Sequence, residues 1–156
     1  MEAGQRALGN RSILADPRDP GMKDTINRLV KHREWYRPFA PAVLHEMQDR
    51  YFTSSTDSPF MQLVIDVKEE AKERIPAVTH VDQSARLQSV SEKSNPAFHR
   101  LIREFHAITG VGVVLNTSFN DNNEPIVCTP QDALKAFFST GLHELYLGSY
   151  RVTKKA

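Results

Sequence analysis

Cysteine and long apolar runs are nearly absent from this sequence. Cys128 is the only cysteine among 156 residues, which excludes an internal disulfide framework and a cysteine-rich zinc site. No apolar run approaches the roughly 20 residues that span a bilayer, and the first residues lack the apolar segment of a signal peptide. These absences predict a protein of the reducing cytoplasm that does not enter the membrane.

Net charge is also nearly absent. The 20 Lys and Arg residues balance 19 Asp and Glu residues, which leaves a formal net charge of +1. Proteins that bind nucleic acids through bulk electrostatics usually carry a strongly basic face, so this balance argues against a nucleic-acid partner. The hydrophobic content of 40% and the charged content of 25% are typical of one soluble, compact domain.

Common catalytic and nucleotide-binding motifs are missing. The sequence has no Walker-type phosphate loop, no G-x-G-x-x-G fingerprint and no G-x-S-x-G nucleophile motif. The six histidines form no metal-ligand pattern, so we predict no protein-held metal. His99 and His106 are expected in solvent on the charged flank of a helix. Cys128 follows Ile126 and Val127, which favours a buried, unreactive thiol.

Helical and strand patterns are mixed along the chain, which predicts an α/β or α+β domain with one twisted mixed sheet. The clearest helix has Asn95 as its N-cap and Pro96 at its first position. Residues 1–20 contain several Gly, Pro and charged residues and are expected to be extended and irregular. The predicted helices are 21–32, 96–109 and 130–140, with a helical turn at 45–52, a loop or exposed helical turn at 68–74, and strands at 42–44, 60–67, 77–81, 85–90, 111–115, 145–147 and 150–153.

Two polar stretches indicate a phosphate-bearing ligand. Residues 115–125, rich in Asn, Ser and Thr, follow a predicted buried strand, and open α/β sheets usually bind ligands at the carboxyl ends of strands. Residues 31–41 supply cations. Cations combined with hydroxyl and amide groups suit phosphate oxygens.

Without a glycine-rich loop, side chains must bind the phosphate, and Lys31, Arg33, Arg37 and Arg86 are the strongest cationic candidates. If the chain is extended at residues 31–33, Lys31 and Arg33 share one side and can straddle one anion. Alternatively, both simply complement the dipole at a helix C-terminus. Arg86 lies in a predicted strand of small and apolar residues, where it either serves a site or faces solvent from an edge strand.

Three further residues are candidates on weaker grounds. Ser118 and Asn120 lie two positions apart and could converge on one ligand, although both residue types also stabilise turns by bonding their own backbone. His80, beside Asp82 on a predicted strand, is the only histidine that we single out as a site residue.

Four segments in order, residues 2–18, 31–41, 79–86 and 115–120, resemble the C-terminal domain of the O-carbamoyltransferases. This family includes nodulation-factor, cephamycin and tobramycin carbamoyltransferases. The resemblance implies a YrdC-like fold, whose K-x-R and S-x-N signatures match residues 31–33 and 118–120.

The resemblance further implies a reaction in which ATP and carbamoyl phosphate form carbamoyl-adenylate and release pyrophosphate. Mg²⁺ would be carried with ATP. A preceding transferase domain, similar to the tRNA threonylcarbamoyl transferase, would pass the carbamoyl group to an acceptor hydroxyl. The implied catalytic residues are Lys31, Arg33, Arg86, Ser118 and Asn120, and Thr79, His80 and Asn116 are implied additional residues of the ATP and carbamoyl phosphate site.

The resemblance also implies a division of the chain. Residues 1–20 are expected to be an interdomain segment of a longer parent protein, and residues 21–156 the YrdC-like domain. Without the transferase domain, this chain is expected to complete at most the adenylating half-reaction. The alternative is a structural or RNA-binding YrdC-like module that has no adenylation activity.

Overall fold

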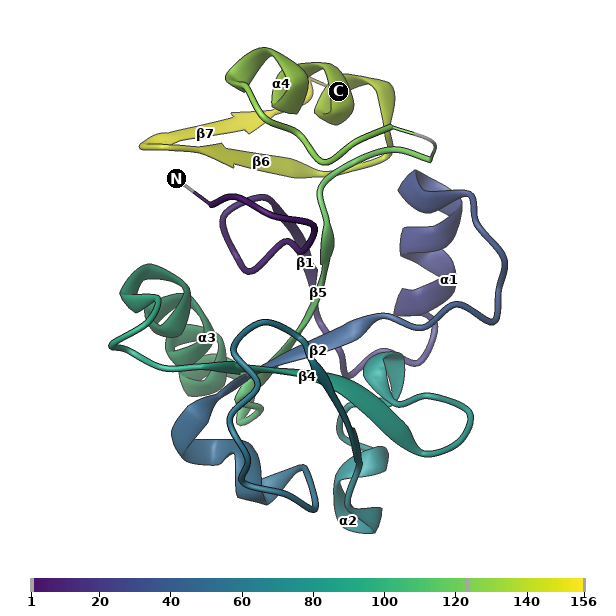
Figure 1. The fold of residues 1–156 in the computed structure, drawn as a ribbon. Helices are drawn as coiled ribbons and strands as arrows, with labels where there is room; N and C mark the ends of the chain where they lie inside the picture. Colours follow the sequence, from purple (N-terminus) through teal and green to yellow (C-terminus); the bar gives the residue numbers. More distant parts are fainter. Residues whose placement is uncertain (1, 123, 156) are drawn as a thin grey trace.

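A five-stranded mixed sheet forms the centre of the computed structural model, which describes residues 2–122 and 124–155 (Figure 1). Its strand order is β1-β5-β2-β4-β3. β2 and β4 run parallel and the other three pairs are antiparallel, which confirms the predicted mixed α/β sheet. The strands are β1 (Ser12–Ala15), β2 (Ala40–Leu44), β3 (Leu63–Asp66), β4 (Ser84–Val90) and β5 (Val113–Ser118).

The two long helices begin where the sequence predicts. In α3 (Pro96–Thr109), the Asn95 side chain accepts a hydrogen bond from the Phe98 backbone N–H. In α4 (Pro130–Ser139), Thr129 and Asp132 form a reciprocal capping box. The other helical segments are α1 (Met22–Ile26), which continues as π-helix over Asn27–Lys31, α2 (Glu69–Lys72), and 3-10 turns at His45–Arg50 and Pro76–Val78.

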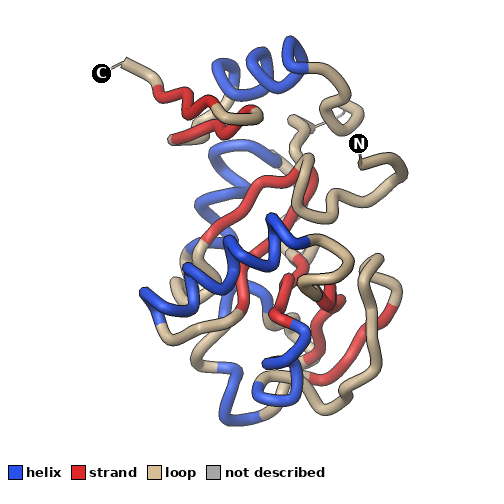
Figure 2. The backbone as a smooth tube through the Cα atoms, turned by 90° about the vertical axis from the view of Figure 1, so that its left-hand side faces the viewer, coloured by secondary structure: helices blue, strands red, loops and turns tan. Residues whose placement is uncertain are grey.

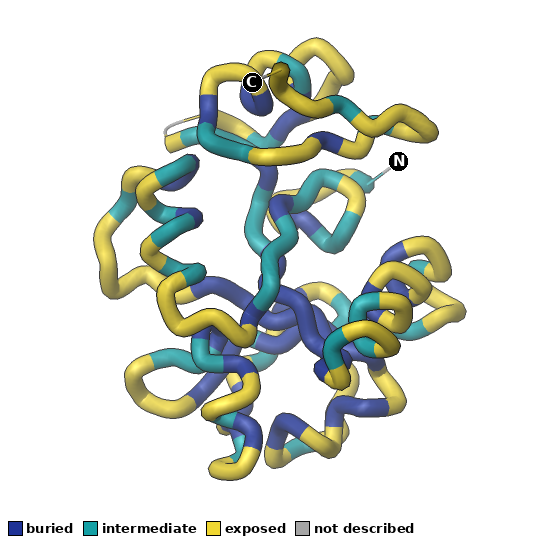
Figure 3. Tube along the Cα trace, turned by 180° about the vertical axis from the view of Figure 1, so that it is seen from behind, coloured by how far each residue is buried: buried dark blue, intermediate teal, exposed yellow. Residues whose placement is uncertain are grey.

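Residues 2–122 and 124–155 contain two hydrophobic clusters. The larger one packs around the five-stranded sheet and α3, which is the dark central region of Figure 3. The smaller one joins α4 to the hairpin of β6 (Glu144–Leu147) and β7 (Tyr150–Thr153), and these elements lie together at the top of Figure 2. Ile13 on β1 belongs to the smaller cluster, whereas Leu14 packs against the larger one. The β1–β5 pair therefore links both parts of the fold.

The N-terminal segment is more ordered than the sequence suggests. The expectation that residues 1–20 are irregular is wrong for Ser12–Ala15, which pair with β5. The Glu2 carboxylate accepts hydrogen bonds from the backbone N–H groups of Leu8 and Asn10. Residues 2–12 consequently form a closed loop that packs on the sheet. The division of the chain at residue 20 stays a prediction.

Two predicted strands are shorter or absent. Residues 76–78 form a 3-10 turn in place of a strand over 77–81, because Pro76 fixes a turn-compatible backbone and the Val78 N–H bonds back to the Ile75 carbonyl. β3 begins only at Leu63 because Met61 has a left-handed backbone and the Ser58 hydroxyl accepts from the Leu63 N–H.

Two side chains lie opposite to expectation. His99 is buried, not solvated, and its Nε2 lies 2.9 Å from a carboxylate oxygen of Glu46, which provides the polar partner that burial requires. Cys128 is exposed, not buried, and its backbone N–H donates to the Asp132 carboxylate at the start of α4. His106 is half-buried. No helix in residues 2–122 and 124–155 is both long and apolar enough to cross a membrane.

Candidate functional site

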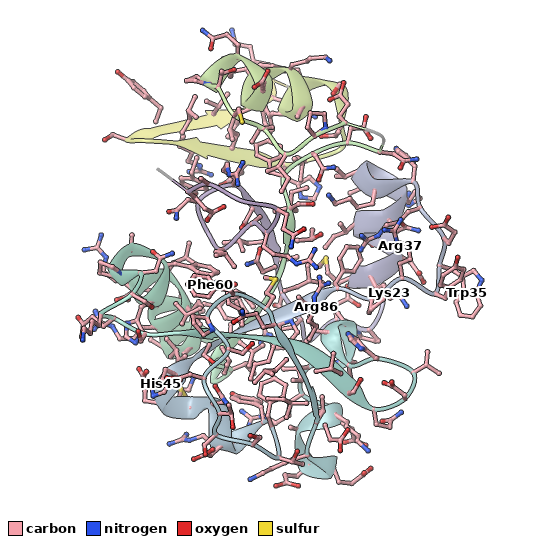
Figure 4. All side chains as sticks on the ribbon, viewed as in Figure 1. Lys23, Trp35, Arg37, His45, Phe60 and Arg86 are labelled. Atoms are coloured by element: carbon pink, nitrogen blue, oxygen red, sulfur yellow. The ribbon has the colours of Figure 1, made fainter. Side chains whose placement is uncertain are left out.

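A cavity of about 450 Å³ brings four arginines together. They come from three separate parts of the chain: Arg6 from the N-terminal loop, Arg33 and Arg37 from the segment before β2, and Arg86 from β4. No Asp or Glu is among the described residues that line it. Figure 4 shows Arg37 and Arg86 in the region between α1 and the sheet. We call this space the arginine cavity. It concentrates positive charge in a chain whose net charge is only +1.

Arg86 is built into the wall of the arginine cavity. β4 lies between β2 and β3, and Arg86 pairs with Val64 of β3, so the alternative of an edge-strand arginine is wrong. Its Nε atom is buried and has no hydrogen-bond partner among the described residues. Burial, reinforced by neighbouring Arg6, lowers the pKa of Arg86, yet a guanidinium stays protonated in proteins. A buried cation with an unused donor favours an anionic ligand.

The backbone of Arg33 is held by Asn27, the first residue of the π-helical segment. The Asn27 side chain donates to the Arg33 carbonyl at 2.6 Å and accepts from the Arg33 N–H at 3.1 Å. The guanidinium lies 4.5 Å from the centre of the Phe39 ring and donates to the Pro38 carbonyl. Burial lowers the pKa of Arg33, and Arg37 lowers it further.

Lys31 does not line the arginine cavity but holds one of its walls in place. Its buried ammonium lies 2.5 Å from the Ser118 carbonyl oxygen, 3.0 Å from the Asn120 carbonyl oxygen and 2.9 Å from Asn120 Oδ1. Burial, and secondarily Arg33, lowers the pKa of Lys31 to about 7. His32 has a left-handed backbone with φ of 45°. The chain is therefore not extended here, and Lys31 and Arg33 do not share one side.

Ser118 and Asn120 form the turn that Lys31 stabilises. The Ser118 hydroxyl donates to Asn120 Oδ1 at 2.5 Å, so the alternative of turn chemistry describes part of their role. Ser118 also lines the arginine cavity, whereas Asn120 does not. The predicted pair therefore occupies one turn and places one hydroxyl at the cavity.

The remaining candidates lie at different depths. Asn116 is buried in the cavity wall and its Nδ2 donates to the Ala7 carbonyl and to Gln88 Oε1. His80 lines both the arginine cavity and a neighbouring one, and burial lowers its pKa. Thr79 lines only the neighbouring cavity, and its hydroxyl donates to the Ile75 carbonyl.

Arg6 lines the arginine cavity but is not among the residues predicted from the sequence. The loop that carries it is fixed because the carbonyls of Ala7 and Leu8 accept hydrogen bonds from the buried amides of Asn116 and Gln88. The dense, motif-like character of residues 2–12 is the signal in the sequence that could have identified it. Its position on the same cavity as Arg86 depends on tertiary structure.

The chain matches the family named carbamoyltransferase C-terminus over residues 1–154. It belongs to this family. The predicted resemblance to the C-terminal domain of O-carbamoyltransferases is thereby confirmed.

Relatives of this carbamoyltransferase domain are much longer proteins. The chain is 51% identical over 157 residues to nodulation protein NolNO of Sinorhizobium fredii, covering 99% of the chain and 23% of that protein. It is 41% identical over 147 residues to 3'-hydroxymethylcephem-O-carbamoyltransferase of Amycolatopsis lactamdurans, covering 94% and 28%. An uncharacterized protein of Methanocaldococcus jannaschii is 46% identical over 155 residues, covering 99% and 26%. The chain thus spans about a quarter of these relatives.

Proposed function

We propose that this carbamoyltransferase domain binds the phosphate groups of ATP and carbamoyl phosphate in the arginine cavity and forms carbamoyl-adenylate. The observation that carries the proposal is the convergence of four arginines on a cavity without a carboxylate. The unpartnered, buried Nε of Arg86 supports it. Both substrates are polyanions that repel each other, and guanidinium groups suit phosphate oxygens in charge and geometry.

The proposed chemistry has two steps. Water cleaves carbamoyl phosphate into carbamate and inorganic phosphate. A carbamate oxygen then forms a bond to the α-phosphorus of ATP, while the bond from this phosphorus to the bridging oxygen breaks and pyrophosphate leaves. Such displacements depend mainly on positioning and on stabilisation of charge. In this proposal Arg33 and Arg86 contact the phosphates directly, and Arg6 and Arg37 add positive charge around them.

Lys31 has an indirect role in the proposal. Its ammonium is occupied by oxygens of Ser118 and Asn120, so it positions the Ser118 hydroxyl at the cavity wall. Asn116 acts similarly by holding the loop that carries Arg6. Both are positioning residues, and the Ser118 hydroxyl, whose hydrogen is donated to Asn120 Oδ1, lies at the cavity wall.

Mg²⁺ is expected to arrive with ATP. The described residues contain no group of three or more side chains that could hold a metal ion, and the lining of the arginine cavity is cationic. Phosphate oxygens are hard ligands of the kind that Mg²⁺ prefers, so ATP itself would supply most of its ligands.

Transfer of the carbamoyl group to an acceptor hydroxyl is proposed to need a further domain. The relative named as an O-carbamoyltransferase is covered by this chain over only 28% of its length. The acceptor-binding groups would then lie in the part of such proteins that this chain does not match.

Carbamoyl-phosphate-dependent exchange of labelled pyrophosphate into ATP, with Mg²⁺, tests the adenylation. We expect Arg86→Gln to abolish exchange and to weaken ATP binding at least about tenfold, because one charge-assisted phosphate contact contributes roughly 1.5–3 kcal/mol. Arg50→Gln, at an exposed arginine outside the cavity, is the matched control and should change neither. ATP binding that depends on Arg86 without any exchange would restrict this chain to binding. Absence of both would refute the proposal.

A further inference from the structure

A second cavity, of about 520 Å³, adjoins the arginine cavity. Pro38, Phe39 and His80 line both, so these residues form a shared wall. The second cavity is also lined by two aromatic side chains, Trp35 and Tyr36. We call it the aromatic cavity. In Figure 4, Trp35 lies on the outer side of the segment before β2 and Arg86 lies on the inner side, with Lys23 between them.

The two aromatic rings are unusually accessible. Trp35 is 71% exposed and Tyr36 is 61% exposed, and their ring centroids lie 6.1 Å apart at an interplanar angle of 82°. Exposed apolar surface beside a concave site marks ligand-binding grooves in many proteins. Neither ring contributes to the hydrophobic core clusters, so packing within this chain does not account for them.

Polar groups at the aromatic cavity suit a planar heterocycle. Lys23 can donate a hydrogen bond and Asp82 can accept one, and both line this space. The His80 ring lies in the shared wall, and its buried Nε2 has no hydrogen-bond partner of good geometry among the described residues. Apolar walls with a few convergent polar groups are the usual composition of a small-molecule site.

We propose that the aromatic cavity binds the base of the nucleotide whose phosphates occupy the arginine cavity. The segment 33–39 sends Trp35 and Tyr36 to one cavity, and Arg33 and Arg37 to the other. A nucleotide has the same division, with a flat aromatic ring at one end and anionic phosphates at the other. This inference rests on the proposed function, since it extends the same ligand across the shared wall.

The test compares ATP with inorganic tripolyphosphate, which has the phosphates but no base. Trp35→Ala should weaken ATP binding about 5- to 100-fold, the range that stacking of one base on an aromatic ring contributes. It should leave tripolyphosphate binding unchanged, as measured by calorimetry. Because Trp35 is 71% exposed, its removal opens no cavity in the core. Tyr150→Ala, at a 76% exposed aromatic residue on β7, is the matched control and should affect neither ligand.

Fluorescence provides an independent readout, because Trp35 is the only tryptophan in the chain. ATP and adenosine should both change its emission, and tripolyphosphate should not. Two results would overturn the base assignment: equal weakening of ATP binding and tripolyphosphate binding in Trp35→Ala, or no effect of ATP on the Trp35 emission. If wild-type protein still bound tripolyphosphate, the arginine cavity would remain a phosphate site. Failure of wild-type protein to bind either ligand would overturn the proposed function as well.

Discussion

The docking of the N-terminal loop on α3 can be tested at one glycine. Gly9 has φ of +118°, and a Cβ atom placed there would lie 2.4 Å from Cδ1 of Phe98. Phe98 is buried in the larger hydrophobic cluster, so its ring cannot easily move away. Gly4 has a similar φ of +114°, but a Cβ atom there meets nothing within 4 Å. The two glycines therefore share the backbone conformation and differ in the steric contact.

The steric difference between Gly9 and Gly4 determines how much unfolding free energy each Gly→Ala substitution should cost. A side chain at such a positive φ costs about 1–3 kcal/mol at either position. Forcing additional atoms against a packed core adds about 1–3 kcal/mol at Gly9 alone. We therefore expect Gly9→Ala to reduce the free energy of unfolding by about 1–3 kcal/mol more than Gly4→Ala does.

Urea unfolding of both variants measures this difference in the free energy of unfolding, and the slope of that free energy against urea concentration should be the same for both. Gly9→Ala should cost less unfolding free energy in a Phe98→Leu background than in the wild-type background, because the smaller side chain relieves the contact. Trypsin should also cleave after Arg6 and Arg11 faster in Gly9→Ala than in Gly4→Ala. Equal stability of the two single variants would show that residues 2–12 do not pack against α3. The placement of Arg6 at the cavity by this loop would then be contradicted as well.

Three further predictions concern other contacts. The pKa of Lys31 is about 7 in the folded chain against an ordinary value of 10.5, so the unfolded chain binds more protons between these pH values. The free energy of unfolding should therefore rise by about 2 kcal/mol from pH 7 to pH 9. Urea titrations at both pH values should show that Lys31→Met removes this rise. Tyr51→Phe should cost about 1–3 kcal/mol of unfolding free energy, because the buried Gly112 N–H loses its acceptor at 2.9 Å; an unchanged urea midpoint would contradict this hydrogen bond. Arg6→Gln should weaken tripolyphosphate binding about tenfold without loss of stability, since Arg6 is exposed; calorimetry beside Arg50→Gln checks it, and equal affinities would exclude Arg6 from the site.

The local signals in the sequence predict those parts of the fold that neighbouring residues control. Asn95 and Gly110 mark both ends of α3 because capping and left-handed termination involve only residues within one turn. Thr129 does the same at the start of α4. The sequence does not predict the 3-10 turn at 76–78 because Ala77 and Val78 also fit a strand, whereas Pro76 and the hydrogen bond from the Val78 N–H to the Ile75 carbonyl fix a turn.

The sequence also identifies the site's chemical character through the types of residue in two polar stretches and in the family signatures. Arg33, Arg86 and Ser118 were all predicted from this information, and all three line one cavity. It could not separate Lys31 from Arg33, because the left-handed backbone at His32 depends on the end of the π-helical segment. That single residue sends Lys31 into the turn at Ser118 and leaves Arg33 at the cavity.

The sequence by itself therefore determined the family, the mixed α/β class, the capped helices and the cationic character of the candidate site. Tertiary structure alone decided which cations share a cavity. Arg6 and Arg86 are separated by about half of the chain, and they line the same cavity because β1 pairs with β5 and the buried amides of Asn116 and Gln88 hold the N-terminal loop. Local propensity acts over a few residues, whereas strand pairing and burial act across the whole fold, so only the folded chain reveals this convergence.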